Sequence, residues 1–233
     1  MDLNILNKML EYIFRDRRTA IEKYCDANFR NINNKIYKEK RGATGGNLYL
    51  NELITPEAYE VQKFKKPFKK VFKEKLLFMR KAGNALAKMT TWFDESKLTY
   101  NDVYLFPRET LTTNLKKCDC EDLAFVMASL DPANCGVAFG KWLPNGSVIW
   151  HSFPYFLFQG VPYTIETTGY RGAFKKLDDT AYIPYLIVTQ NRTYEVKQGV
   201  KFGKEVYLWL PFQSQKSTKL FYCLERKYIY DGN

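Results

Sequence analysis

One stretch decides how the chain is interpreted: Lys117-Cys118-Asp119-Cys120-Glu121-Asp122-Leu123-Ala124. Apolar residues recur at helical spacing from Leu123 to Leu130, which predicts a helix that begins near Cys120. Asp119 is a residue type favoured at the N-cap, and Asp122 at the third helical position can return a hydrogen bond as in a capping box. We therefore expect Cys120 in the first helical turn, where unpaired amides and the positive end of the helix dipole favour a thiolate.

The helix end alone does not make Cys120 a nucleophile. A free cysteine with a pKa of about 8.5 is only a few per cent ionised at neutral pH. The helix end contributes roughly 0.3 to 1 kcal/mol, and the neighbouring acids Asp119, Glu121 and Asp122 disfavour a further negative charge. Cys120 therefore needs a cationic partner, and the single histidine of the chain, His151, is the candidate.

Downstream of this helix the sequence has the period of β-strands. The predicted strands are 137–143, 147–158, 161–167, 182–188 and 206–212, with a further one at 220–224. Pro144-Asn145-Gly146 is a strong turn signal, and Gln159-Gly160 is a second. An even-length turn near Gln159 would bring His151 and Glu166 to the same sheet face, within hydrogen-bond reach. Glu166 would then fix the imidazole tautomer and stabilise its protonated form.

The N-terminal region reads as helical. Apolar residues between Leu3 and Phe14 are spaced as on one face of an amphipathic helix, and Thr55-Pro56-Glu57 is typical of a helix start. Helices followed by a central helix and then an antiparallel sheet indicate an α+β fold. We expect an N-terminal helical region over residues 1–95, packed on a core over residues 96–233.

Three blocks in series resemble the transglutaminase-like superfamily: Asp119-Cys120-Glu121-Asp122-Leu123-Ala124, His151-Ser152-Phe153 and Ile165-Glu166-Thr167-Thr168. The run Asp102-Val103-Tyr104-Leu105-Phe106-Pro107-Arg108-Glu109-Thr110-Leu111 is similar to the lead-in of bacterial transglutaminase-like cysteine peptidases. The resemblance covers about Asp102 to Thr168. Two positions depart from the family pattern: Cys118 stands where a glycine is usual, and Tyr104-Leu105 stand where the family has Trp-Gln.

The resemblance implies a papain/transglutaminase-like core, in which a helix carrying Cys120 packs on an antiparallel sheet. It implies Cys120 as nucleophile, His151 as general base and acid, and Glu166 as the orienting carboxylate. The Cys120 backbone N–H can then supply one oxyanion donor, and the Tyr104 hydroxyl or another backbone N–H the second. The expected function is a cysteine peptidase, amidase or transglutaminase that acts on a protein or peptide and needs no cofactor. The alternative is an inactive module of the same fold that binds a protein or nucleic acid.

A zinc site is a rival interpretation of the same residues. Cys118, Cys120, Cys135 and His151 form a permitted tetrahedral set, but Cys-x-Cys is shorter than the usual ligand spacing, so we expect no metal. Cys118 can also form a disulfide with Cys120 or be an inert neighbour, and the geometry of such a short loop favours the inert thiol.

A basic segment precedes the candidate site. Seven lysines lie between Lys63 and Lys75, with Phe64, Phe68 and Phe72 at intervals of four. They indicate either an anionic partner, such as nucleic acid or a membrane surface, or a helix that buries its Phe stripe and solvates its lysines. The formal net charge of +11 favours acidic partners without naming one. Five cysteines in 233 residues, with neither a signal h-region nor an apolar stretch long enough to span a membrane, predict a reduced cytoplasmic protein.

Overall fold

The computed structural model describes residues 16–32, 38–41, 46–90, 105–112, 118–143, 149–168, 174–177, 182–196, 201–202 and 205–206. Its α-helices are α2 (Ala20–Asn28), α3 (Tyr59–Lys65), α4 (Lys75–Met89), α5 (Pro107–Thr112) and α6 (Cys120–Leu130). Two 3₁₀-helices, η2 (Leu50–Leu53) and η3 (Lys66–Val71), lie before and after α3. The predicted helix between Leu3 and Phe14 lies outside the described residues.

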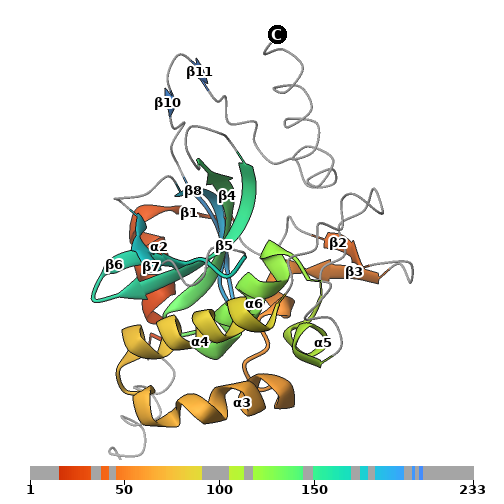
Figure 1. The fold of residues 1–233 in the computed structure, drawn as a ribbon. Coiled ribbons are helices and arrows are strands. Elements are labelled where there is room, and N and C mark those ends of the chain that lie inside the picture. Colours follow the sequence, from red (N-terminus) through yellow and green to blue (C-terminus); the bar gives the residue numbers. More distant parts are fainter. Residues whose placement is uncertain are drawn as a thin grey trace, which may run out of the picture.

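An antiparallel sheet of seven strands forms the centre of the fold, in the order β1-β9-β8-β4-β5-β6-β7 (Figure 1). Its strands are β1 (Arg30–Asn31), β4 (Cys135–Trp142), β5 (Ile149–Phe158), β6 (Val161–Ile165), β7 (Phe174–Lys176), β8 (Tyr182–Val188) and β9 (Thr193–Glu195). Two separate strand pairs are β2 (Lys38–Arg41) with β3 (Gly46–Tyr49), and β10 (Lys201–Phe202) with β11 (Glu205–Val206).

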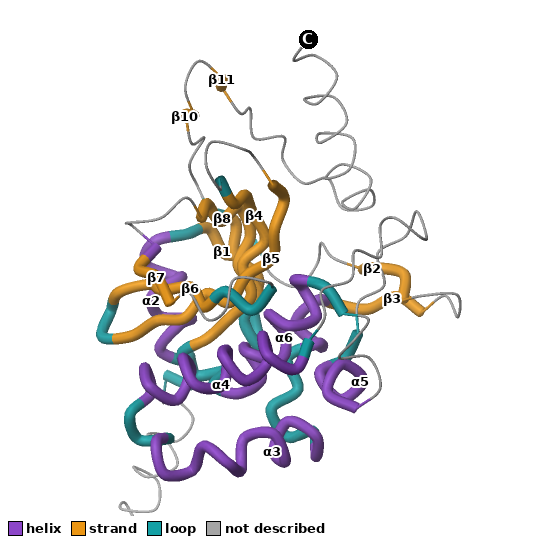
Figure 2. Tube along the Cα trace, in the orientation of Figure 1, coloured by secondary structure: helices purple, strands orange, loops and turns teal. Residues whose placement is uncertain are grey.

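Helices cover both faces of the central sheet, and side chains on β4 alternate between them. Val137 and Phe139 belong to the apolar cluster that includes α4 and α6, whereas Ala138 belongs to the cluster that includes α2. Figure 2 shows α3, α4, α5 and α6 gathered on one side of the strands. The α+β class is therefore confirmed, and the N-terminal region contributes both α2 and the edge strand β1.

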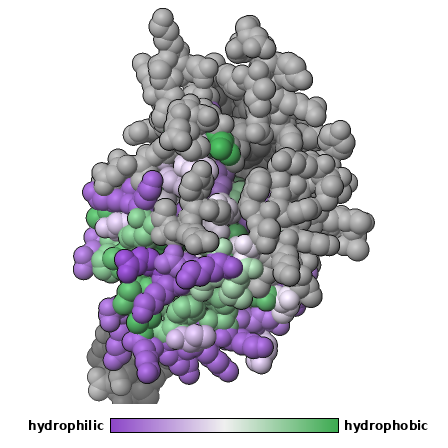
Figure 3. Space-filling model, viewed as in Figure 1, coloured by the Kyte–Doolittle hydropathy of each residue, from purple (hydrophilic) through white to green (hydrophobic). Residues whose placement is uncertain are grey.

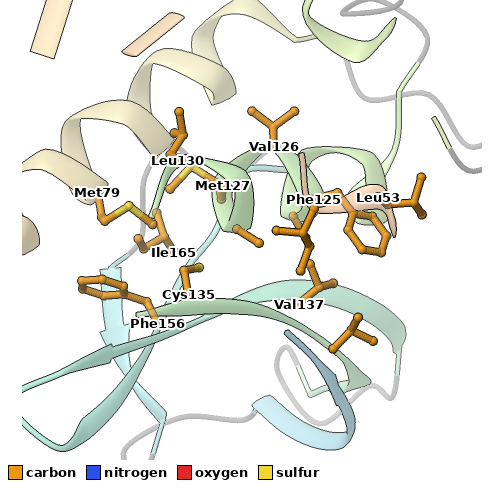
Figure 4. Packing of buried hydrophobic residues seen from close by; sticks show 14 of the residues in the cluster. Leu53, Met79, Phe125, Val126, Met127, Leu130, Cys135, Val137, Phe156 and Ile165 are labelled. Atoms are coloured by element: carbon orange, nitrogen blue, oxygen red, sulfur yellow. The ribbon is translucent and has the colours of Figure 1, made fainter. Parts of the chain in front are cut away.

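The first face of the sheet is packed mainly by α6. Its residues Phe125 and Met127 are fully buried in one cluster with Met79 of α4 and with Val137 and Ile165 of the sheet (Figure 4). Helix α6 is apolar nearly all round, as expected for a helix enclosed by a sheet and other helices. This packing fixes where the first residue of α6, Cys120, meets the sheet.

The predicted strands of the sheet are largely confirmed. β4, β5, β6 and β8 coincide with the predicted runs to within two residues at each end. The turn at Gln159-Gly160 is also confirmed: both residues have positive φ, at 51° and 77°, and Phe158 pairs with Val161. The turn at 144–146 and the strand at 220–224 lie outside the described residues, as does all of 206–212 except Val206, the last residue of β11.

The predicted helix start at Thr55 is wrong. Helix α3 begins at Tyr59, because residues 55–58 form a turn in which the Ala58 N–H donates to the Thr55 carbonyl at 3.2 Å. The Thr55 N–H donates to the Ser129 hydroxyl of α6 at 2.9 Å, so this segment is tied to the core before the helix starts. Among the described residues, no helix combines the length and apolar composition that crossing a membrane requires.

Candidate active site

Helix α6 begins at Cys120 with Asp119 as its N-cap residue, as predicted, but the predicted capping box is absent. Asp119 has extended backbone angles (φ −117°, ψ −159°), and its side chain makes no capping hydrogen bond. Asp122 instead accepts the Leu105 N–H at 2.8 Å. The buried Asp122 carboxylate therefore ties the segment before α5 to α6, an interaction between chain segments that a local cap rule does not anticipate.

The sulfur of Cys120 has partners on the sheet and on its own helix. Sγ accepts the Ser152 N–H of β5 at 3.4 Å and donates to Oε2 of Glu121 at 3.2 Å. The thiol is half-buried, and Glu121 is buried. The Cys120 N–H belongs to the first helical turn, whose amides lack partners within the helix.

Strand pairing explains why an N–H of β5 is available to sulfur. β6 pairs with β5 only from Phe156 to Phe158. Hydrogen bonds of successive strand residues alternate in direction, and the Leu157 N–H already donates toward β4, to the Asn134 carbonyl. The Ser152 N–H therefore points to the open edge, and Pro154 between these positions has no N–H to donate. Among the described residues, Cys120 takes the position that a neighbouring strand would have at this edge.

Because Ser152 follows His151 directly, the same contact brings Cys120 next to the histidine backbone. Bond lengths place Sγ within about 6 Å of the His151 Cα atom. Among the described residues, the hydrogen-bond partners of the thiol are Ser152 and Glu121, and the imidazole is not one of them. The His151 backbone thus lies next to Cys120 at one sheet edge. The imidazole lies on the same sheet face as Phe153, in the cluster of α2, and makes no direct hydrogen bond with the thiol.

His151 and Glu166 meet as the sequence predicts. Nε2 of His151 lies 2.9 Å from Oε2 of Glu166, and both side chains are buried. The register of the 159–160 hairpin puts Glu166 diagonally across from His151 on the same face. Since an ionised carboxylate only accepts, Nε2 carries the proton of the neutral ring and Nδ1 is left as its basic nitrogen.

Four donors surround the Glu166 carboxylate. Oε2 accepts from His151 and, at 2.7 Å, from the Tyr182 hydroxyl, while Oε1 accepts from the Thr168 N–H at 2.8 Å and the Thr168 hydroxyl at 2.6 Å. Burial alone would raise the pKa of Glu166, but these hydrogen bonds and the charge of His151 outweigh it and lower the pKa to about 2. Glu166 is therefore an anion at neutral pH.

Aromatic side chains enclose the imidazole. Its ring centroid lies 5.6 Å from that of Trp142, 6.0 Å from that of Tyr182 and 6.1 Å from that of Phe153. Trp142 and Tyr182 stack with an interplanar angle of 15°. A shift of register between β4 and β8 at Phe139/Gly140 brings these two residues opposite each other. This enclosure restricts the ring to one orientation.

The electrostatics of the thiol follow the sequence argument. Burial raises the pKa of Cys120 well above its ordinary value, and the charges of Glu121 and Asp119 raise it further. The Ser152 N–H acts in the opposite direction but does not compensate. The isolated Cys120 side chain is therefore a neutral thiol at physiological pH.

The remaining predicted residues do not join this group. Cys135 pairs with Phe156 on β5, four positions and about 13 Å along the strand from Ser152, so it lies far from Cys120. Cys118 is buried, and in the described part of the chain no three His, Cys, Asp or Glu residues are grouped as metal ligands. Tyr104, the expected oxyanion donor, lies outside the described residues.

Sequence reasoning missed Tyr182, Trp142 and the Ser152 N–H. The first two belong to predicted strands, but a register shift, which has no clear sequence signal, decides their meeting. Pro154, three residues after His151, is a usable signal for an unpaired strand edge. No model of a protein family matches the chain, and no curated protein and no solved structure matches it either.

Proposed function

We propose that the protein is a thiol-dependent acyl transferase or hydrolase that cleaves amide bonds of a protein or peptide. Cys120 is the nucleophile, His151 the general base and acid, and Glu166 the orienting carboxylate. A papain/transglutaminase-like arrangement of helix and sheet is part of this proposal. The observation that supports it best is the hydrogen bond from the Ser152 N–H to the Cys120 thiol. Ser152 directly follows His151, and the His151 ring in turn donates to the buried Glu166.

The reaction begins with the neutral thiol. Because burial and two acids oppose a thiolate, the proton leaves sulfur as sulfur attacks the carbonyl carbon, and Nδ1 of His151 accepts it. The proton must therefore move from its hydrogen bond with Glu121 toward the imidazole when substrate enters. The Cys120 N–H, in the first turn of α6, donates to the oxyanion.

The second half of the reaction returns the proton. The imidazolium of His151 protonates the departing amine, the C–N bond breaks, and a thioester on Cys120 remains. Glu166 stabilises the imidazolium through Nε2 during this interval. Water or an amine then attacks the thioester, and His151 accepts the proton of the attacking group. The C–S bond breaks, and His151 returns that proton to sulfur, which restores the thiol. Water completes hydrolysis, whereas an amine completes cross-linking.

Alkylation by iodoacetamide, followed by peptide mass spectrometry, tests the nucleophile. We expect Cys120 to be labelled faster than the buried Cys25 and than Cys223, and His151→Ala to slow Cys120 at least tenfold while Cys223 is unchanged. Incubation with p-nitrophenyl acetate should leave an acetyl group on Cys120, and Cys120→Ala should remove it. Equal labelling of Cys120 with and without His151 would leave only the inactive-module alternative.

A further inference from the structure

The lysines before the candidate site form one surface on α3, η3 and the start of α4. We call it the lysine surface, and it consists of Lys63, Lys65, Lys66, Lys69, Lys70, Lys73 and Lys75. All are exposed except Lys65, which is half-buried. Figure 1 shows α3 on the outer side of the helical layer, and Figure 3 shows hydrophilic residues, with hydrophobic ones between them, on this part of the described surface.

Phenylalanines anchor the lysine surface to the core. Phe64 and Phe68 pack against the apolar cluster of α4 and α6, and the ring of Phe68 lies 6.1 Å from that of the buried Phe78. The prediction that this Phe stripe faces a core is therefore confirmed for these two rings. The same packing turns the lysines outward and holds their backbone in place.

Few carboxylates among the described residues lie near this surface, although the charges of Asp131 and Glu57 act on Lys65. Glu74 is the single acid among the thirteen residues from Lys63 to Lys75. Within the part of the chain that the structure describes, no salt bridge pairs any lysine of this surface with a carboxylate. Exposed like charges held close together repel one another, and a polyanion relieves that repulsion.

The backbone arranges part of this charge as a row. Lys63 and Lys66 are three residues apart at the end of α3, and Lys66 and Lys69 are three apart in the 3₁₀-helix η3. Three residues rise about 4.5 Å in an α-helix and about 6 Å in a 3₁₀-helix, where side chains three apart eclipse. The row therefore presents positive charges at short intervals, and the backbone of a nucleic-acid strand presents its phosphates at short intervals too.

Between Lys63 and Lys75 one aromatic ring is exposed, that of Phe72, and it does not favour insertion into a membrane. The exposed Tyr59 lies at the start of α3, before these lysines. Phe72 is 40% exposed, but its ring lies 5.0 Å from that of Phe78, and Nζ of Lys65 lies 4.3 Å from the ring centroid. It thus has contacts on the protein already. A surface with seven lysines and one exposed ring that already packs on Phe78 fits phosphates better than the acyl region of a bilayer.

We propose that the lysine surface binds the phosphate backbone of nucleic acid without regard to sequence, with Lys63, Lys66 and Lys69 as the central contacts. This inference does not depend on the chemistry of Cys120. It uses phosphate neutralisation alone, since base-specific readout requires contacts that a row of lysines does not supply.

Fluorescence anisotropy with a labelled duplex DNA of about 24 base pairs and mixed sequence tests the proposal on the whole protein. With four to six phosphates neutralised, affinity should fall about a hundredfold to a thousandfold between 50 and 200 mM KCl. Changing Lys63, Lys66 and Lys69 to Gln should weaken binding and lower the slope of log affinity against log salt by about 3. The affinity for a labelled single strand of equal length, compared with that for the duplex, shows which of the two forms the protein prefers.

The matched control changes three exposed lysines elsewhere, Lys23, Lys88 and Lys175, to Gln and so has the same net charge. It should keep the wild-type salt slope to within about 1. Equal losses in both variants would show that net charge alone attracts DNA and would overturn the proposal. Binding to vesicles with one third phosphatidylserine, without binding to either nucleic acid, would overturn it in favour of a membrane surface.

Discussion

The hydroxyl of Tyr182 donates to Oε2 of Glu166 at 2.7 Å, the same oxygen that meets Nε2 of His151 at 2.9 Å. Two donors on one oxygen leave the carboxylate little freedom to rotate, and Thr168 binds the other oxygen. The orientation of the imidazole therefore depends on a tyrosine from β8 as well as on the carboxylate. Tyr182 joins the site through hydrogen bonding and through its stack on Trp142.

Tyr182→Phe should reduce the free energy of unfolding by about 1 to 3 kcal/mol, because it removes a donor from a buried carboxylate and keeps the ring. Urea denaturation at pH 7 measures the change. Tyr163→Phe is the control, since among described residues the Tyr163 hydroxyl has no hydrogen-bond partner and its ring stacks on Phe174. We expect Tyr163→Phe to reduce the free energy of unfolding by less than about 0.5 kcal/mol. An equal reduction in both variants would contradict the role of the Tyr182 hydroxyl.

The buried, hydrogen-bonded carboxylate of Glu166 should make the fold sensitive to acid. Its pKa is lowered in the folded protein to about 2 from an ordinary value of 4.5, so the stabilisation is complete above about pH 5 and is lost as pH falls toward 2. The shift corresponds to about 3 kcal/mol. Urea denaturation between pH 3 and 7 should show a shallower acid slope for Glu166→Gln than for the wild type. The same slope in both proteins would contradict the assignment.

Glu121→Gln should make the Cys120 thiol more reactive. Glu121 accepts its hydrogen bond at 3.2 Å and is one cause of the raised pKa of Cys120. A unit charge about 4 Å away is worth about 1 kcal/mol even in water, so alkylation near pH 7.5 should accelerate at least about fivefold. Mass spectrometry of iodoacetamide labelling measures this change. Glu109→Gln, on α5, is the charge-matched control, and equal acceleration in both variants would exclude a local effect.

The predictable part of the site was the part encoded locally. The helix start at Cys120 follows from Asp119 and the apolar spacing after it, and the approach of His151 to Glu166 follows from the two-residue turn at Gln159. Both depend on neighbours in the sequence. Once the turn is known, strand register alone predicts that His151 and Glu166, fifteen residues apart, lie on the same face of the sheet.

The unpredicted part depends on contacts between distant segments. Asp122 bonds to Leu105 instead of to its own helix end, because tertiary packing offers it a buried N–H. Tyr182 reaches Glu166 after a register shift in β8 that no residue pattern announces. The prediction of a helix start at Thr55 is wrong for a related reason, since the Thr55 N–H donates to the hydroxyl of Ser129 on α6. Local sequence patterns predict the conformation of each segment, but they do not predict which distant segment it contacts.

Asp122 offers the clearest test of such a contact. Asp122→Ala leaves the Leu105 N–H without its acceptor and should cost about 1 to 3 kcal/mol of unfolding free energy. Asp122→Asn keeps a carbonyl oxygen at the same place and should restore most of the loss, because the amide can still accept from Leu105. Urea denaturation of both variants measures the difference. If Asn and Ala are equally destabilising, the charge of Asp122 and not its hydrogen bond to Leu105 stabilises the start of α6.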